Sequence, residues 1–163
     1  VMVPPQAILI LMYRGHGAYL IPYFWHKGIC RIFGLRVRIA GEPVSSAQTL
    51  FISNHVSYLD IPVMGSTLKA SFVAKREVAD WPVFGFLSRM QQTAFISRSR
   101  GDAQREKNAL GNMLKEGKSL ILFPEGTSTD GRDVAPFTSS LFSMALDGEH
   151  PDLIVQPFPL RID

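Results

Sequence analysis

"TLFISNHVSYLD", residues 49–60, is the stretch of sequence that decides the fold of this chain. It opens with a short apolar run, and a polar loop follows that carries His55 and ends at Asp60. Short apolar runs bounded by polar residues are typical of buried strands, and an aspartate is well suited to begin a helix. We therefore expect a buried strand over residues 48–53 and a helix that starts near Asp60. The open question is whether His55 and Asp60 act together between these two elements.

The alternation of strand and helix continues on both sides of this stretch. We predict further strands over residues 35–41, 70–75, 93–97, 120–123 and 153–160. We predict helices over residues 19–34, 60–68, 80–90, 101–119 and 138–148, with Asp102 capping the fourth of them. Only one side of the segment 35–41 is apolar, which indicates a half-buried edge strand. Strands that alternate with helices predict an α/β domain with a largely parallel sheet flanked by helices.

The first part of the chain, residues 1–34, differs in character from the domain that we expect over residues 35–163. Between residues 19 and 34, apolar side chains recur at helical spacing, while Lys27 and Arg31 share the opposite side. This pattern is typical of an amphipathic helix in a lipid interface, and it equally fits a helix packed on the domain's own core. We favour a membrane-associating segment, because aromatic residues stand at the boundary of the apolar side.

Length and composition limit the classes of protein to which the chain can belong. The 163 residues fit one domain, and 46% of them are hydrophobic, yet no stretch reaches the roughly 18 unbroken apolar residues of a spanning helix. The apolar run over residues 7–13 fits the trimmed end of a membrane segment or a short buried piece. The 17 basic and 14 acidic residues leave a net charge of +3 without a dense basic run, so we expect no nucleic-acid partner.

The ends of the sequence and its single cysteine place few further limits on the class of protein. Cys30 excludes an internal disulfide and agrees with a reducing compartment. The chain starts at Val1 rather than at Met, which leaves open that it is part of a longer protein and that the domain is C-terminally incomplete.

His55 falls where a buried strand is expected to end, and crevices at the carboxyl ends of strands are where α/β proteins place their sites. On an ideal helix, residues five apart point about 140° away from each other. His55 and Asp60 can therefore meet only if the residues between them form a turn. Asp60 would then hold one imidazole nitrogen and leave the other free as a general base. The structural alternative is a loop histidine followed by an aspartate that only caps a helix.

Two further polar segments follow predicted strands and would open on the same edge of a parallel sheet. "FISRSR", residues 95–100, carries Arg98 and Arg100, and "LFPEGTSTDG", residues 122–131, carries Glu125 and Gly126. Neither contains a nucleophile motif of the G-x-S-x-G type.

Taken together, these segments resemble the glycerolipid acyltransferases of the lysophosphatidic acid acyltransferase family. That family is marked by four blocks, and the chain shows a counterpart of each in order: "NHVSYLD", "AFISRSR", "FPEGT" and "VQPFPL". "FVAKREVADWPVFGF" also resembles the family's segment between the first two blocks. The resemblance extends over roughly residues 30–162.

The resemblance implies the fold of that family and the transfer of a fatty acyl chain from a thioester of acyl carrier protein or coenzyme A to a lysolipid hydroxyl. His55 would be the general base and Asp60 its orienting partner, as a dyad that needs no cofactor and no metal. It further implies work at a membrane surface, on the cytoplasmic face of the inner (plasma) membrane.

The resemblance also implies a set of substrate-binding residues: Asn54, Lys75, Arg98, Glu125, Gly126 and Thr127. Arg98 matches a head-group ligand of the second block, and Glu125 and Gly126 match the acceptor-binding pair of the third. The structural alternatives are a surface cation at Arg98 and a turn glycine at Gly126.

Two departures from the family pattern bear on the acceptor. Gln92 stands where the second block usually opens with glycine, and Ser128 stands where phosphatidate-forming members usually carry an arginine. An arginine there would be a natural phosphate ligand. Together with "FTSSLF" at residues 137–142, where a basic run is common, this variant resembles the branch that acylates lyso-ornithine lipid.

Three alternatives remain beside that interpretation. The first is a 1-acyl-sn-glycerol-3-phosphate acyltransferase that forms phosphatidic acid, and the second is an inactive lipid-binding relative. The third is a metal-dependent hydrolase, which is poorly supplied with ligands because the four histidines show no H-x-x-x-H or H-E-x-x-H spacing.

Overall fold

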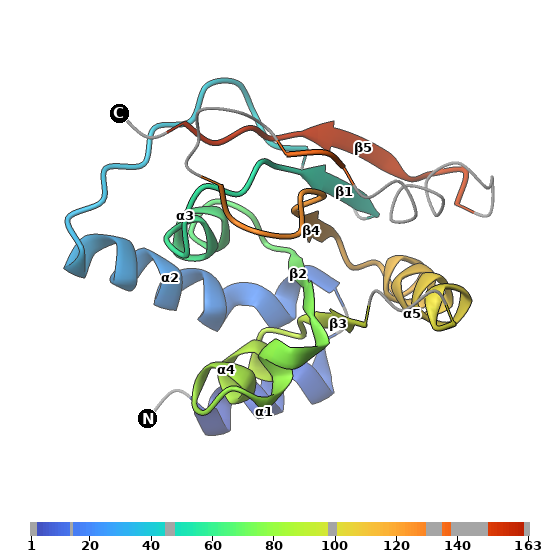
Figure 1. The fold of residues 1–163 in the computed structure, drawn as a ribbon. Coiled ribbons are helices and arrows are strands. Elements are labelled where there is room, and N and C mark those ends of the chain that lie inside the picture. Colours follow the sequence, from blue (N-terminus) through green and yellow to red (C-terminus); the bar gives the residue numbers. More distant parts are fainter. Residues whose placement is uncertain are drawn as a thin grey trace.

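A five-stranded parallel sheet forms the centre of the computed structural model, which describes residues 3–13, 15–44, 48–97, 101–129, 135–137 and 150–161 (Figure 1). Its strands are β1 (Thr49–Ile52), β2 (Ser71–Lys75), β3 (Ala94–Ile96), β4 (Leu120–Leu122) and β5 (Ile154–Pro157). They lie in the order β3-β2-β4-β1-β5, and each adjacent pair is parallel. The predicted α/β fold with a largely parallel sheet is confirmed.

Helices cover both faces of this sheet. The α-helices are α1 (Val3–Met12), α2 (Leu20–Ile32), α3 (Asp60–Gly65), α4 (Phe84–Met90) and α5 (Ala103–Lys115). Two 3-10 helices, η1 (Gly15–Tyr19) and η2 (Arg76–Asp80), precede α2 and α4. In Figure 1, α2 and α3 lie on one side of the sheet and α5 lies on the other. The helix predicted over residues 138–148 lies outside the described residues.

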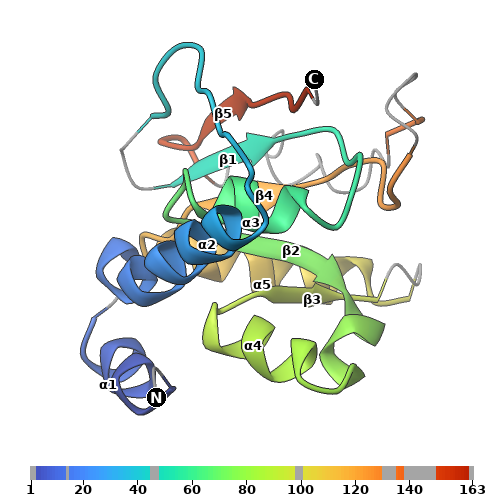
Figure 2. The ribbon, with the colours of Figure 1, turned by 90° about the vertical axis from the view of Figure 1, so that its left-hand side faces the viewer.

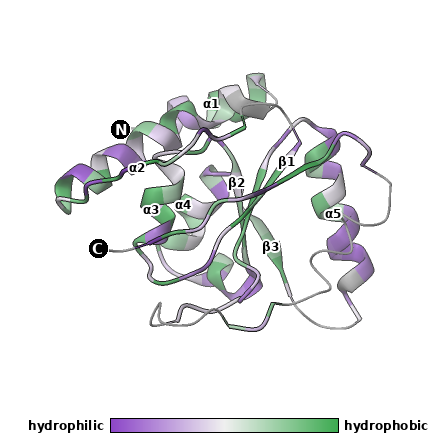
Figure 3. Cartoon of the chain, turned by 90° about the horizontal axis from the view of Figure 1, so that it is seen from above, coloured by the Kyte–Doolittle hydropathy of each residue, from purple (hydrophilic) through white to green (hydrophobic). Residues whose placement is uncertain are grey.

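The core has two layers because successive residues of a strand point to opposite faces. The layer against α5 contains Leu50, Val73, Ile96, Leu110, Leu114, Leu120 and Leu122. The layer against α3 contains Phe51, Met64, Leu68, Ala70, Phe72, Ile121 and Phe123. Figure 3 shows the labelled strands as predominantly hydrophobic ribbons between more mixed helices. Burial on both faces explains why the central strands are continuous apolar runs rather than alternating ones.

Residues 35–41 do not form the predicted edge strand. They have no strand partner among the described residues, and the apolar side chain of Val37 is 38% exposed. The edge position beside β1 belongs to β5. The residues that follow this segment contact β5 through the side chain of Gln156, whose Oε1 accepts the N–H of Val44 and whose Nε2 donates to the carbonyl of Glu42. The alternating pattern therefore has no ladder of hydrogen bonds to join.

The start of α4 also differs from the prediction, because the helix begins at Phe84 rather than at residue 80. Val83 has a φ of 63°, which interrupts the helical path immediately before Phe84. The backbone at Gly85 lies so close to Ala79 that an added Cβ would clash with the Ala79 carbonyl oxygen. The preceding residues form η2 and a tight turn instead.

Asp102 occupies the N-cap position of α5 as predicted, but its side chain makes no capping hydrogen bond. Its Oδ2 instead accepts a hydrogen bond of 2.8 Å from the hydroxyl of Ser97. Asp102 thus connects the end of β3 to the start of α5.

α2 packs on the core through a different side from the apolar stripe seen in the sequence. Its buried residues are Pro22, His26 and Cys30, which recur every four positions and therefore share one side of the helix. His26 lies against α3 at Gly65, where an added Cβ would clash with the His26 ring. The interpretation of α2 as a core-packed helix is confirmed for this side. Its other side leaves residues such as Phe24 exposed, and binding of that side to lipid stays a prediction.

α1 packs beside α4, as Figure 2 shows. The Gln6 side chain donates to the carbonyls of Met90 (2.8 Å) and Ala18 (2.9 Å), which fastens the N-terminal helices to the end of α4. Exposed apolar side chains on α1, at the start of α4 and on the residue before α4 are together called the α1–α4 apolar surface: Ile8, Leu11, Met12, Val83 and Phe84. None of the described helices is both long and apolar enough to span a bilayer.

Candidate active site

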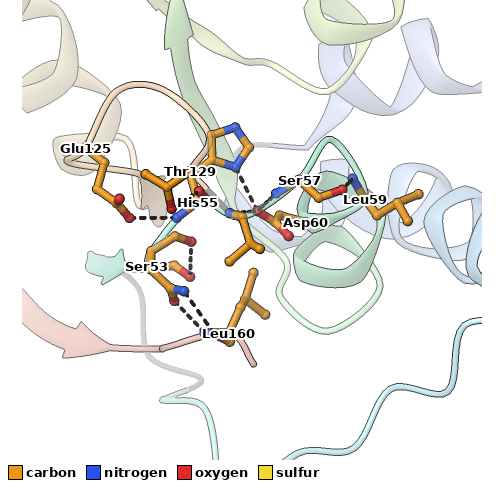
Figure 4. Close-up of polar contacts among 10 residues, drawn as sticks. Ser53, His55, Ser57, Leu59, Asp60, Glu125, Thr129 and Leu160 are labelled. Atoms are coloured by element: carbon orange, nitrogen blue, oxygen red, sulfur yellow. Dashed lines mark hydrogen bonds and ion pairs between the residues drawn. The ribbon is translucent and has the colours of Figure 1, made fainter. Parts of the chain in front are cut away.

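His55 and Asp60 are hydrogen-bonded to each other at the carboxyl end of β1 (Figure 4). The distance from His55 Nδ1 to Asp60 Oδ2 is 2.7 Å. The same oxygen also accepts the backbone N–H groups of Val56 (2.6 Å) and Ser57 (2.9 Å). These bonds hold the residues between His55 and Asp60 in a turn, which is the condition under which the two side chains can meet.

The hydrogen bonds fix which nitrogen of His55 carries the proton. An ionised carboxylate only accepts hydrogen bonds, so Nδ1 must donate to Asp60. In the neutral imidazole, Nε2 is then the acceptor, and it has no hydrogen bond to any described residue. The His55 side chain is 16% exposed and the Asp60 side chain 4% exposed, so a buried carboxylate orients a partly accessible base.

The loop after β4 forms the other wall of the site. Phe123 stacks on the His55 ring, and the carboxylate of Glu125 accepts a hydrogen bond of 2.9 Å from the backbone N–H of His55. Gly126 has a φ of +66°, and its N–H donates to the carbonyl of Phe123, so the four residues 123–126 close a turn. Gly126 is therefore a turn residue, and its contact with an acceptor stays a prediction.

Asn54 joins the first block to the end of the chain. Its Nδ2 donates to the carbonyl of Leu160 (3.0 Å), and its Oδ1 accepts the N–H of Leu160 (2.7 Å). This paired contact, visible in Figure 4, holds the loop beside the segment that follows β5. Substrate binding by Asn54 stays a prediction, while its side chain already has this structural task.

The remaining predicted site residues are spread along the same edge of the sheet. Lys75 is exposed at the end of β2, which is separated from β1 by β4, so its backbone lies about 10 Å from that of the His55 strand. Thr127 is exposed beside the turn at Gly126. Arg98 follows β3 in the sequence and lies outside the described residues. Among the described residues, no group of three or more His, Cys, Asp or Glu side chains could hold a metal ion.

Reasoning from the sequence missed Phe123 and Thr129 as neighbours of His55, and Leu160 as the partner of Asn54. In the sequence Phe123 only opens the third family block, and the Thr129 N–H donates to the carbonyl of His55 at 2.9 Å. One signal was available for Phe123, because it is the first residue after a buried strand that ends at the sheet edge of the site. Leu160 contributes its main chain, for which a sequence carries no signal.

A parallel α/β domain with a carboxylate-oriented histidine at the carboxyl edge of its sheet defines a class of protein equipped for proton transfer at that edge. Within this class, the model of the Acyltransferase family matches residues 36–160, and the chain belongs to this family.

Several curated relatives share this region. The chain is 38% identical over 145 residues to a lyso-ornithine lipid O-acyltransferase of Brucella abortus, a match that covers 88% of this chain and 54% of the relative. It is 40% identical over 139 residues to a protein of the same name from Rhodobacter capsulatus, which covers 83% of this chain and 50% of the relative. A 1-acyl-sn-glycerol-3-phosphate acyltransferase of Neisseria gonorrhoeae is 38% identical over 99 residues, covering 60% of this chain and 39% of that protein. The chain thus spans about half the length of the lyso-ornithine relatives.

A solved structure shares the fold. The crystal structure of the 1-acyl-sn-glycerophosphate (LPA) acyltransferase from Thermotoga maritima superposes with a TM-score of 0.62 at 22% identity, and the match covers 88% of this chain and 61% of that one.

Proposed function

We propose that the protein is an O-acyltransferase that moves a fatty acyl chain from an acyl thioester to the hydroxyl of a lysolipid. The observation that carries this proposal is the bond between His55 Nδ1 and Asp60 Oδ2, which leaves Nε2 of a partly accessible imidazole as the acceptor of a proton. Membership of the Acyltransferase family supports the type of reaction. The donor is a thioester of acyl carrier protein or of coenzyme A.

In the proposed reaction, Nε2 of His55 accepts the proton of the lysolipid hydroxyl while the hydroxyl oxygen forms a bond to the thioester carbonyl carbon. The carbon–sulfur bond then breaks, and the thiol leaves with the proton that His55 returns. An acyl thioester is already activated, so the protein has to orient the two substrates and move one proton. Asp60 keeps the imidazole in the required tautomer throughout.

The proposed acceptor is lyso-ornithine lipid. Relatives with that name match more than four fifths of this chain, whereas the match to the 1-acyl-sn-glycerol-3-phosphate acyltransferase of Neisseria gonorrhoeae covers 60% of it. The site also carries Ser128, an exposed neutral residue, where phosphatidate-forming members usually carry an arginine. Lysophosphatidic acid is the second candidate, since Lys75 is an exposed cation on the same edge of the sheet.

We further propose that the enzyme works on a membrane surface, at its cytoplasmic face, with the α1–α4 apolar surface against the lipid. Leu11 of α1 is 87% exposed and Phe84 of α4 is 62% exposed. Lys27 and Arg31 of α2 are exposed cations that would favour an anionic bilayer.

Acyl transfer from a labelled thioester to lyso-ornithine lipid, with the product identified by mass, tests the activity. We expect His55→Ala to reduce the rate by roughly 100-fold to 10,000-fold, because that is the usual contribution of a general base. Asp60→Asn should also be severely impaired, since an amide oxygen alone cannot accept the bonds from His55, Val56 and Ser57.

His150→Ala serves as the matched control for loss of a histidine, and each variant is checked for folding by its thermal unfolding curve. A folded His55→Ala protein that keeps most of the wild-type rate would contradict the proposed mechanism.

A further inference from the structure

The loop that follows β4 holds His55 from three directions. The Phe123 ring stacks on the imidazole with centroids 4.5 Å apart and planes at 24°. The Glu125 carboxylate accepts a hydrogen bond of 2.9 Å from the backbone N–H of His55, and the Thr129 N–H donates to the His55 carbonyl at 2.9 Å. The ring face, the amide and the carbonyl of one residue are thus all held by a segment far away in the sequence.

Glu125 uses both of its carboxylate oxygens for backbone groups. Oε1 accepts the N–H of His55, and Oε2 accepts the N–H of Ala135 at 2.9 Å. The residue is only 7% exposed. A buried carboxylate whose charge is met by two N–H groups is a fixed part of the framework. In this arrangement Glu125 connects the His55 loop to residues 135–137.

Phe123 fixes the plane of the imidazole. It belongs to the core layer against α3, where its ring stacks on Phe72 with centroids 6.3 Å apart and planes at 11°. The His55 ring therefore rests on a surface that is itself anchored in the core. Asp60 holds the Nδ1 edge of the same ring. Because one edge and one face of the imidazole ring are held, its Nε2 atom points in one fixed direction.

We propose that Glu125 and Phe123 are positioning residues that act on the reaction through His55, an inference that rests on the proposed function. The family resemblance assigns Glu125 to the acceptor, whereas its two hydrogen bonds assign it to the backbone, including that of the base. Positioning of a catalytic group matters at the level of the ångström, since a displacement of about 1 Å can cost about 100-fold in rate.

The two roles of Glu125 differ in what its removal changes. A residue that binds the acceptor head group affects the acceptor KM and acts independently of His55. A residue that positions His55 affects kcat and has little left to act on once the imidazole is gone, because residues that work as a unit are not additive.

The experiment measures kcat and the acceptor KM of Glu125→Gln in the wild-type chain and in the His55→Ala background. The glutamine keeps the length of the side chain and can accept only one of the two N–H groups. We expect kcat to fall about 10-fold to 100-fold with the acceptor KM changed less than about twofold. In the His55→Ala background we expect a further loss of less than about twofold.

Equal losses in both backgrounds, or a raised acceptor KM with an intact kcat, would overturn the positioning role and leave the proposed function standing. A wild-type rate in the His55→Ala protein itself would overturn both, so the two failures are distinguishable.

A second pair of variants tests Phe123. Phe123→Leu removes the flat face under the imidazole, and Phe51→Leu removes a buried ring of the same core layer whose ring contact is with Phe158. We expect both to lower the melting temperature, and only Phe123→Leu to lower kcat, by about 10-fold, in a protein that is still folded at the assay temperature. An equal kcat for both variants would show that Phe123 contributes only to packing and would overturn its positioning role.

Discussion

Asp60 does two things at once at the start of α3. It is the first residue of that helix, and its Oδ2 gathers the Nδ1–H of His55 and the N–H groups of Val56 and Ser57. Three donors on one buried oxygen make a charge-assisted network in which the loop backbone and the imidazole are fixed by the same atom. The proposed proton transfer and the local fold therefore depend on the same carboxylate.

Ser128 is the residue at which the choice of acceptor can be tested. It is exposed in the loop after β4, where an arginine would offer a bidentate ligand to a phosphomonoester. A charge-assisted hydrogen bond is worth about 1.5–3 kcal/mol, or roughly 10-fold to 150-fold in preference. We expect Ser128→Arg to move the preference from lyso-ornithine lipid toward lysophosphatidic acid by an amount in that range.

Competition between the two acceptors at equal concentration measures this preference. Ser128→Gln, which is also long but uncharged, is the control for size. A wild-type enzyme that strongly prefers lysophosphatidic acid would overturn the acceptor assignment without touching the acyl transfer itself.

His26 makes the stability of the fold dependent on pH. Its Nε2 is hydrogen-bonded to Gln91 Oε1 at 2.7 Å, and its buried Nδ1 has no hydrogen-bond partner among the described residues. Burial lowers the pKa of His26 below its ordinary 6.5, although the bond to Gln91 opposes this shift. The folded state thus favours the neutral ring. The contribution of His26 is fully present above pH 6.5 and is lost as the pH falls toward the lowered value, because the unfolded chain takes up the proton first.

We therefore expect the free energy of unfolding in urea to be lower at pH 5.5 than at pH 7.5. His26→Gln should be less stable at pH 7.5, since it loses the ring contacts with Trp25 and Phe72, but its decline toward pH 5.5 should be smaller. An equal decline in the variant and the wild type would assign the pH dependence to other groups.

Among the elements, α1 and α4 carry the prediction about membranes. Transfer of a leucine or phenylalanine side chain out of water is worth about 1.5–3 kcal/mol when burial is complete. We expect the double variant Leu11→Gln with Phe84→Gln to lower the partition coefficient onto anionic phosphatidylglycerol vesicles by about 10-fold or more. Co-sedimentation with vesicles measures it.

Ile154→Gln is the matched control, because this exposed residue lies on β5, at the opposite edge of the sheet from β3. Deletion of residues 1–34 is a poorer test, since Tyr19 and His26 are buried in the core and their loss would unfold the domain. Equal partitioning of the double variant and the wild type would show that the α1–α4 apolar surface does not meet the lipid.

The elements also show what a sequence can and cannot predict. The buried strands β1 and β4 were predictable because their apolar runs are short and bounded by polar residues. The spacing of His55 and Asp60 left their pairing open, and the family resemblance favoured it. The segment 35–41 has the alternation of a strand, yet β4 and β5 occupy both places beside β1. Which segment becomes the edge strand is decided by contacts between distant parts of the chain, and these contacts leave no pattern in the local sequence.

The same limit applies to the site. The pairing of His55 with Asp60 needed a turn, and that turn is held by the Asp60 side chain itself. The hydrogen bond from the backbone N–H of His55 to Glu125 joins residues seventy positions apart, so no spacing rule could have predicted it. The family blocks pointed to Glu125 as an acceptor-binding residue, which stays a prediction, whereas the positioning of His55 is our proposal from the two hydrogen bonds of its carboxylate.

At the scale of the whole molecule, the order of the strands gathers the site from three distant regions. β1 lies between β4 and β5, so the loops that carry His55, Glu125 and Leu160 emerge side by side. Because all strands run parallel, Lys75 opens on the same edge and gives that edge a cation two strand positions from the base. A head group bound there would reach from Nε2 of His55 toward β2.

The position of β1 between β4 and β5 also has a consequence for the synthesis of the protein on the ribosome. Leu50 pairs with Leu120 on one side and with Val155 on the other, so both neighbours of β1 are translated long after it. At roughly 5–20 residues per second, a ribosome leaves this apolar strand without either partner for several seconds. During that interval both edges of β1 are unpaired in the nascent chain. We therefore expect β1 to be the segment that a chaperone would bind until β5 has emerged from the ribosome.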